Sequence, residues 1–417
     1  MSDTASIAVD HSALWQQQTT IAMEAIVRFF RYFFLSFLLV GSAFLHANEA
    51  FDLTPAQRAE LERFAPGVEF TPELAATLRA IAYDQNRSLD ERIKAMQKAA
   101  GFSLGEPLKR RICIWDIGGR SGPIFKAAED QRTRLRQYGV DLHIEPYTKE
   151  SVAAEDLKAG LCDAALITGL RGRQFNKYTG TIDAIGALPT QEHMHILLQA
   201  LASPKSADKM ISGEYVILGV APAGGAYIFV NDKNINTLGK AAGKRVAVLD
   251  YDPTQAEMVS QIGATPIASD IVSAPNKFNN GVVDVIVAPL LAYELLELYK
   301  GMGPNGGIID YPLAQITMQL IGRKDKFPNE VAQLVREEFY KSYPLIMERL
   351  NLEAVKVPER WMIQIPPEDK KEYQMMMQEA RLRLRQKGYY DANMLTLQRK
   401  VRCKLDATRA ECSNPVE

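Results

Sequence analysis

The chain has 417 residues, of which 47% are hydrophobic, and 49 basic and 50 acidic side chains give it a formal net charge of -1. This length suffices for two or three domains with sizeable cores. The balanced charge argues against a general binder of nucleic acid or of membrane surfaces, because such proteins carry a basic excess.

An export signal is predicted near the N-terminus. Arg28 and Arg31 precede an apolar run over 32–45, and small and polar residues follow it. These are the parts of a secretory signal peptide. The run has 14 residues, whereas a membrane span needs about 20 apolar residues, so a membrane anchor is the weaker alternative. We expect a signal segment over 1–47, with the true start at Met23, and a mature chain that does not span a membrane.

A helical extension is predicted over 48–107. Thr54-Pro55 and Thr71-Pro72-Glu73 are typical of helix N-caps followed by a proline in the first turn. Ser88 and Glu91 fit a capping box ahead of a further helix.

Two similar units of alternating strands and helices follow. In the first, strands are expected over 111–118, 140–147 and 162–169, with helices over 122–139 and 151–160. In the second, strands are expected over 244–250, 264–269 and 282–289, with helices over 253–263 and 274–281. This alternation predicts parallel sheets covered by helices.

A short local pattern recurs in the two units. A helix, a glycine, two residues and an aspartate occur once at 160–163, ending at Asp163, and again at 281–284, ending at Asp284. The repetition favours two similar lobes, although parallel α/β units resemble one another in any case.

Two extended segments, 214–234 and 306–327, connect the units. A chain that leaves one lobe, builds a second and returns forms a double hinge, which suits closure around a ligand. We therefore expect lobe I over 108–215 plus 312–350, lobe II over 216–311, and a helical C-terminal extension over 351–417.

Four cysteines remain in the mature chain, and an even number permits disulfides in an oxidising compartment. Cys403 and Cys412 lie in a polar tail and are expected to close a small loop. Cys113 and Cys162 lie in predicted strands, where a disulfide and two buried free thiols remain open alternatives.

Three sequence blocks resemble the periplasmic solute receptors of TRAP transporters, the DctP-type binding proteins. The blocks are NTLGKAAGKRVAVLDYDPTQAEMVSQIGATPI (236–267), KFNNGVVDVIVAP (277–289) and, more loosely, LKAGLCDAALITG (157–169). Within that fold the chain is similar to the AdeT-like group, whose members are often labelled as components of RND efflux. The resemblance covers about 108–345. It implies an α/β fold of the type II periplasmic-binding class, a periplasmic location, capture of a small molecule in an interlobe cleft, and delivery to a membrane transporter.

Two positions depart from the TRAP-receptor pattern. The carboxylate-binding arginine of that family falls on Ala247, and its asparagine before the conserved proline falls on Ala288. Alanine cannot replace a bidentate arginine clamp. The usual organic-acid ligand of the family is therefore not expected here.

Candidate ligand contacts follow the strands, because ligands of open α/β sheets bind beyond the carboxyl ends of the strands. The glycine-rich loop after the first strand is alternatively a plain tight turn, and the arginines after the third strand are alternatively exposed. The paired acids after the fourth strand favour a cationic or polyhydroxylated ligand. Tyr227 and Tyr293 would supply aromatic walls. The candidates are Asp116, Arg120, Ser121, Thr168, Arg171, Arg173, Tyr227, Asp250, Tyr251, Asp252, Thr254, Pro289 and Tyr293.

No motif predicts catalysis, a cofactor or a nucleic-acid partner. The chain has no GxSxG, HExxH or Walker A pattern. His193 and His195 would share one face of a predicted strand, but no further ligand completes a metal site. Two functions remain: a periplasmic solute receptor for a membrane transporter, or an accessory protein of an efflux or envelope complex that uses the same fold as a scaffold.

Overall fold

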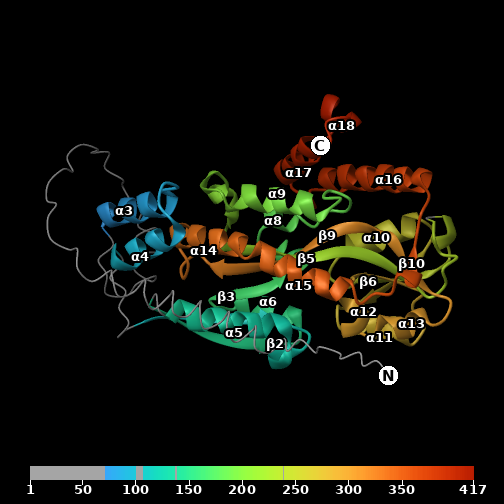
Figure 1. Ribbon diagram of the computed structural model, residues 1–417, viewed down its shortest axis with the longest axis horizontal. Helices are drawn as coiled ribbons and strands as arrows, with labels where there is room; N and C mark the ends of the chain where they lie inside the picture. Colours follow the sequence, from blue (N-terminus) through green and yellow to red (C-terminus); the bar gives the residue numbers. More distant parts are fainter. Residues whose placement is uncertain (1–70, 100–106, 137–138, 238) are drawn as a thin grey trace, which may run out of the picture. The chain divides into compact units, whose positions relative to one another are not determined.

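The computed structural model describes residues 71–99, 107–136, 139–237 and 239–417 (Figure 1). The predicted signal segment and the cap at Thr54-Pro55 lie outside these residues. Within them, no helix is both long and apolar enough to cross a membrane.

The N-terminal helices begin at the predicted caps. In α3 (Pro72–Tyr83) the Thr71 side chain accepts a hydrogen bond from Leu74 N. Before α4 (Leu89–Ala99), Ser88 N donates to Glu91 Oε2 at 2.8 Å and Glu91 N donates to Ser88 Oγ at 3.3 Å, which confirms the capping box. The two helices share a small apolar core with α14 (Asn329–Lys341).

The first unit forms three parallel strands in the order β2-β1-β3. The strands are β1 (Leu108–Trp115), β2 (Val140–Tyr147) and β3 (Ala164–Thr168), and the helices are α5 (Pro123–Arg136) and α6 (Glu150–Lys158). Both faces of β1 are buried, because Ile112 and Ile114 enter one apolar cluster and Cys113 and Trp115 another. This two-sided burial explains why the strand is a continuous apolar run.

The second unit repeats the arrangement in the order β8-β6-β7. Its strands are β6 (Arg245–Leu249), β7 (Thr265–Ser269) and β8 (Val285–Pro289), and its helices are α10 (Pro253–Gln261) and α11 (Ser273–Asn279). Each predicted helix and strand of both units is present, with ends shifted by a few residues.

The recurring aspartate has the same role in each unit. Asp163 Oδ2 accepts a hydrogen bond from Arg111 N at 2.7 Å, and Asp284 Oδ2 accepts one from Arg245 N at 2.9 Å. The glycine three residues earlier has a φ of 76° at Gly160 and 68° at Gly281. The sequence repeat therefore encodes one structural device, which ends a helix and anchors the following strand to the first strand of its unit.

Two long antiparallel strands join the units into one ten-stranded sheet. β5 (Tyr215–Val230) and β9 (Gly307–Arg323) pair along most of their length; β9 also pairs with β3, and β5 with β8. Both predicted extended segments are thus strands. The described residues all lie in one compact unit, so the division into two lobes stays a prediction.

The remaining elements cover the sheet and extend the chain (Figure 1). The predicted helix over 327–350 is two helices, α14 and α15, because the chain breaks at Ser342, ahead of Pro344. The other helices and short strands are α7 (Gly169–Gly172), α8 (Lys177–Gly180), α9 (Gln191–Ala202), α12 (Ala292–Leu295), α13 (Leu298–Met302), α15 (Tyr343–Ala354), α16 (Pro367–Gln386), α17 (Ala392–Leu405), α18 (Ala410–Ser413), β4 (Ile211–Ser212), β10 (Met362–Ile363) and the 3-10 helices η1 (Gly119–Ser121), η2 (Pro204–Met210), η3 (Gly239–Ala241) and η4 (Glu359–Trp361).

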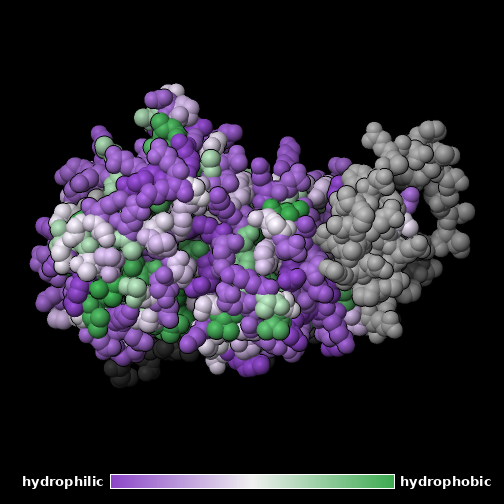
Figure 2. Space-filling model, turned by 180° about the vertical axis from the view of Figure 1, so that it is seen from behind, coloured by the Kyte–Doolittle hydropathy of each residue, from purple (hydrophilic) through white to green (hydrophobic). Residues whose placement is uncertain are grey.

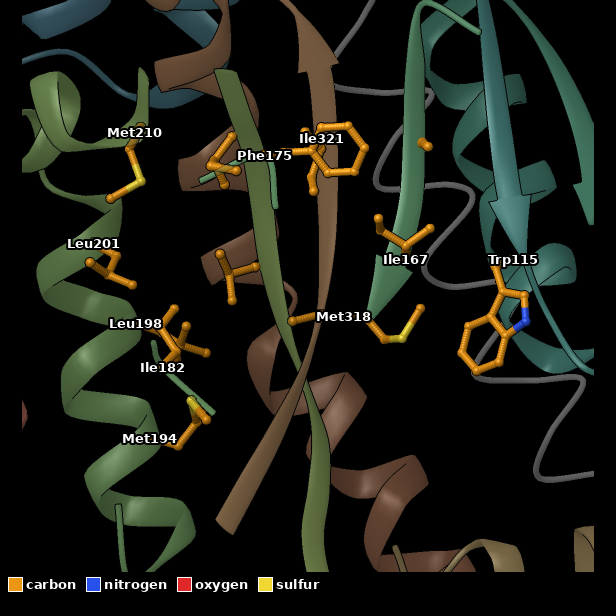
Figure 3. Close-up of a cluster of buried hydrophobic side chains, with 14 of the residues drawn as sticks. Trp115, Ile167, Phe175, Ile182, Met194, Leu198, Leu201, Met210, Met318 and Ile321 are labelled. Carbon is orange, nitrogen blue, oxygen red and sulfur yellow. The ribbon is translucent and has the colours of Figure 1, made fainter. Parts of the chain in front are cut away.

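The largest core lies between the sheet and α9. Figure 3 shows Met194, Leu198 and Leu201 pointing from α9 toward the strands that carry Met318 and Ile321. These helix residues follow the helical spacing, and Thr190 accepts a hydrogen bond from His193 N as the N-cap. The prediction that His193 and His195 lie on a strand was therefore wrong.

Both candidate disulfides form. Cys403 and Cys412 connect α17 to α18, as predicted, and Cys113 and Cys162 connect β1 to the start of β3, with Cα atoms 5.9 Å apart. The open alternative for the second pair is thus decided in favour of a bridge. The face of the described residues that Figure 2 shows is mostly hydrophilic, with scattered apolar patches.

Candidate functional site

The loop after β1 is organised around a buried carboxylate. Asp116 accepts hydrogen bonds from the backbone N–H groups of Gly118 at 2.8 Å, Ile124 at 2.8 Å and Phe125 at 3.0 Å. Its carboxylate thus occupies the N-terminus of α5, where an anionic ligand would otherwise find N–H donors. A Cβ atom at Gly122 would lie 1.9 Å from Asp116 Oδ1, so glycine is required there. Arg120 and Ser121 are exposed at the far side of this turn.

The loop after β3 is held by a buried glutamate that the sequence reasoning missed. Glu150, the first residue of α6, accepts hydrogen bonds from Thr168 N at 2.7 Å and from Arg171 Nε at 2.9 Å. Burial raises the pKa of the Glu150 carboxyl, and the hydrogen bonds from Thr168 and the charge of Arg171 oppose that shift. Thr168 Oγ1 in turn accepts from Arg171 N at 3.3 Å and caps α7.

This loop contacts the loop after β6. The guanidinium carbon of Arg171 lies 3.7 Å from the centroid of the Tyr251 ring, a cation–π contact. Burial raises the pKa of Tyr251, and its hydroxyl has no hydrogen-bond partner among the described residues. The sequence placed Arg171 and Tyr251 at strand ends, and the structure brings them together.

Arg173 has a denser set of contacts. Its Nε and Nη2 donate to the Gly180 carbonyl at 3.2 and 3.0 Å, and its Nη1 donates to the Tyr389 hydroxyl. The guanidinium lies 4.1 Å from the Tyr389 ring centroid and 5.3 Å from that of Tyr390. Its Nη1 also lies 3.9 Å from Oδ2 of Asp252, which belongs to the loop after β6.

Two buried aspartates lie near this arginine. Asp252 caps α10, because its Oδ1 accepts from Thr254 N at 3.1 Å and from Thr254 Oγ1 at 2.5 Å. Asp183, which the sequence reasoning missed, accepts from Thr317 Oγ1 at 2.7 Å and from Thr317 N at 3.3 Å. Burial raises the pKa of Asp183 to about 7, although the Thr317 hydrogen bonds and the Arg173 charge oppose the shift.

A cavity of about 1560 Å³ opens at these loops and extends along the sheet. Its wall is mostly apolar and draws on both strand groups and on α16. Six candidates from the sequence line it, as do the two alanines at the departing positions: Asp116, Thr168, Arg173, Asp252, Thr254, Pro289, Ala247 and Ala288. Residues that the sequence did not single out also line it, among them Ile185, Asp183, Met258, Val287, Leu313, Tyr373, Met376 and Tyr390.

The other candidates lie outside the wall. Tyr227 and Tyr293 pack in an apolar cluster with Phe229 and Ala288. Asp250 is exposed, like Arg120 and Ser121. Arg171 and Tyr251 stack on each other behind the wall. Candidates from the loops after β3 and β6 therefore contact one another, whereas two of the three candidates after β1 are exposed.

The histidines have partners in the protein. His193 Nδ1 lies 2.7 Å from Thr190 Oγ1, and burial lowers the pKa of His193 to about 4. The His195 ring stacks on Tyr343 and Tyr340, with centroids 4.4 and 5.5 Å away. In the part of the chain that the structure describes, no three His, Cys, Asp or Glu side chains gather as a metal site.

Residues 111–417 match the family model described as "Solute-binding protein AdeT 1/2". The chain is 41% identical over 304 residues to the probable solute-binding protein AdeT1 of Acinetobacter baumannii, covering 72% of this chain and 99% of that protein. It is 27% identical over 233 residues to the probable solute-binding protein AdeT2 of the same organism, covering 56% and 98%.

Solved structures of similar fold are periplasmic TRAP solute-binding proteins. One, from Desulfovibrio salexigens with bound orotic acid, has a TM-score of 0.59 and 16% identity and covers 71% of this chain and 99% of its own. Another, from Sulfitobacter sp. NAS-14.1 with bound β-D-galacturonate, has a TM-score of 0.57 and 16% identity and covers 70% and 99%. These likenesses confirm the predicted α/β fold class.

Proposed function

This chain belongs to the family of solute-binding proteins AdeT 1/2, and we propose that it works in the periplasm as a receptor that captures a small molecule for a membrane transporter. The predicted N-terminal signal segment and the periplasmic origin of the similar structures support the location. The proposed role is binding and delivery, without catalysis.

The observation that carries the proposal is the cavity at the carboxyl ends of β3 and β6. Its polar residues come from two strand groups, with Arg173 after β3 and Asp252 after β6. Ligands of open α/β sheets bind at this end of the strands. A solute held there would contact both groups at once.

The two long strands supply a means of closure. β5 changes register against β9 between Pro222 and Gly224 and between Ala226 and Ile228, and Gly224 has a φ of 97°. These irregularities lie where β5 passes from its pairing near β3 to its pairing with β8. A bend at this point would separate the loops after β3 and β6, so we propose that it acts as the hinge between the two lobes.

A specific observation keeps the accessory role as the second candidate. The carboxylate-binding positions of TRAP receptors hold Ala247 and Ala288. The helices α16 to α18 also form a layer bound by buried ion pairs, including Arg402 with Glu411 and Glu417 at 2.6 Å each. In this alternative the layer would contact an RND-type efflux or envelope partner.

A thermal-shift screen of mature chain (48–417) against organic acids, polyamines, sugars and drugs tests the receptor. A ligand at one hundred times its Kd should stabilise the protein by about 2.7 kcal/mol. Val287→Trp should weaken that stabilisation, because Val287 is 40% exposed and lines the cavity, so that an indole would project into the ligand space.

Val282→Trp is the matched control, since Val282 is 46% exposed and lies outside the cavity wall. If every stabilising compound acts equally on both tryptophan variants, the ligand binds elsewhere and the receptor proposal is wrong. If no compound stabilises the wild type, the accessory role is favoured.

A further inference from the structure

We infer that the preferred ligand of this cavity is an organic cation with an apolar body, an inference that rests on the proposed receptor function. It departs from the bound molecules of the similar structures, which include orotic acid and β-D-galacturonate. The charges around the loop after β3 carry the argument.

The buried carboxylates outnumber the guanidinium at this end of the cavity. Asp183 and Asp252 are 3% and 4% exposed, and both line the wall beside Arg173. Arg110, the other buried arginine of the wall, lies in β1 and donates to the backbone carbonyls of Lys326 and Lys109. One guanidinium neutralises one carboxylate, so the site holds one uncompensated negative charge when both aspartates are ionised and none when Asp183 is protonated.

Arg173 has little capacity left for an anionic ligand. Three of its nitrogens already donate, two to the Gly180 carbonyl and one to the Tyr389 hydroxyl, and its face covers the Tyr389 ring. A ligand carboxylate would have to displace these partners and also approach Asp252. Like charges brought together at a buried site are strongly unfavourable.

Asp252 retains an acceptor for a cation. Its Oδ1 serves Thr254, whereas its Oδ2 accepts no hydrogen bond from the described residues and lies 3.9 Å from Arg173 Nη1, beyond hydrogen-bond reach. An ammonium or amidinium group would supply the missing donor in a charge-assisted bond. This oxygen, which is ion-paired with Arg173 but accepts no hydrogen bond from the described residues, is the acceptor that a cationic ligand would use.

The charge state of Asp183 is compatible with this ligand. Burial raises the pKa of its carboxyl to about 7, against the hydrogen bonds from Thr317 and the charge of Arg173. A cation in the cavity would favour the ionised carboxylate, and an anion would favour the protonated acid.

The apolar side chains of the wall indicate that the uncharged part of the ligand is apolar. The cavity wall also includes the apolar or aromatic side chains of Ile185, Met258, Val287, Ala288, Leu313 and Tyr390. At the two positions where the sequence resemblance expects an arginine and an asparagine, Ala247 and Ala288 add no polar group to the wall. A hydrocarbon or aromatic body would bury its surface there.

Three planar probes of nearly equal size separate charge from shape: benzamidine is a cation, benzamide is neutral and benzoate is an anion. Calorimetric titration of the mature chain should show benzamidine binding at least about tenfold more tightly than benzoate, with benzamide between them. Asp252→Asn should remove most of the preference for benzamidine, while an asparagine can still cap α10.

Asp270→Asn is the matched control. Asp270 also caps a helix, accepting from Val272 N at 3.0 Å, but it is exposed and outside the cavity wall. This variant should keep the wild-type preference, which shows that the loss in Asp252→Asn is local.

Benzoate binding as tightly as benzamidine, or an Asp252→Asn variant with unchanged preference, would overturn the inference while leaving the receptor function intact. Failure of all three probes would also overturn it. The receptor function itself fails separately, when the wider screen yields no compound whose binding depends on the cavity.

Discussion

Loss of the proton from the buried Asp183 carboxyl should lower the free energy of unfolding of this protein as pH rises. The folded-state pKa is raised from 3.8 to about 7 by burial. Between about pH 4 and pH 7 the folded state therefore binds more protons than the unfolded state, and the free energy of unfolding decreases with pH. Since one pKa unit corresponds to about 1.4 kcal/mol, this single group lowers the free energy of unfolding by at most about 4 kcal/mol by pH 8.

Asp183→Asn removes the titration and keeps an acceptor for the Thr317 hydroxyl. We expect the variant to gain about 3 kcal/mol on the wild type between pH 5 and pH 8. The unfolded-state carboxyl is already ionised at pH 5, so that only the folded-state carboxyl, with its pKa of about 7, titrates over this range. Urea unfolding at pH 5, 6, 7 and 8 measures the free energy of unfolding of both proteins. The contributions of titratable groups that both proteins share cancel in the difference.

Asp270→Asn is again the control, because an exposed carboxyl is ionised in both states over this range. A difference between Asp183→Asn and the wild type that stays constant from pH 5 to pH 8 would refute the reasoning.

Three further changes test the structure. Arg402→Met removes the buried guanidinium that bridges Glu411 and Glu417, each of which keeps one other arginine partner, and should cost about 3–5 kcal/mol in urea unfolding. Lys400→Met, on the exposed side of the same helix, should cost little, and equal costs would contradict the buried ion cluster. Gly122→Ala places a Cβ 1.9 Å from Asp116 Oδ1 and should destabilise by about 1–3 kcal/mol, unlike Gly239→Ala, which meets nothing within 4 Å. Serine at both cysteines of the α17–α18 disulfide should lower the free energy of unfolding by about 2–4 kcal/mol, and a melting temperature that does not respond to reductant would contradict that bridge.

Local signals explain why much of the fold could be predicted from the sequence. The cap at Ser88 and Glu91 and the repeated glycine-to-aspartate pattern that ends at Asp163 and Asp284 depend on residues within a few positions of one another. Parallel strands buried on both faces leave continuous apolar runs, so their positions could also be predicted. The prediction that His193 and His195 lie on a strand was wrong because a short apolar segment fits a helix and a strand alike.

The site was harder to predict because its contacts join distant residues. Reasoning from strand ends suggested Arg173 and Asp252, which line the cavity, but Asp183 pairs with Thr317 and Arg173 contacts Tyr389, far along the chain. Asp116 shows that position at a strand end does not reveal how a carboxylate is used. It lies at a strand end, yet its carboxylate is satisfied by three backbone N–H groups of its own loop.

The central claim is that a solute binds in the cavity between the loops after β3 and β6. The most direct test is a crystal structure of the mature chain with the compound that stabilises it most. We expect density for that compound within contact of both Arg173 and Asp252, with its apolar part against Val287. Density for the same compound on the outer surface, with these three side chains untouched, would contradict the account.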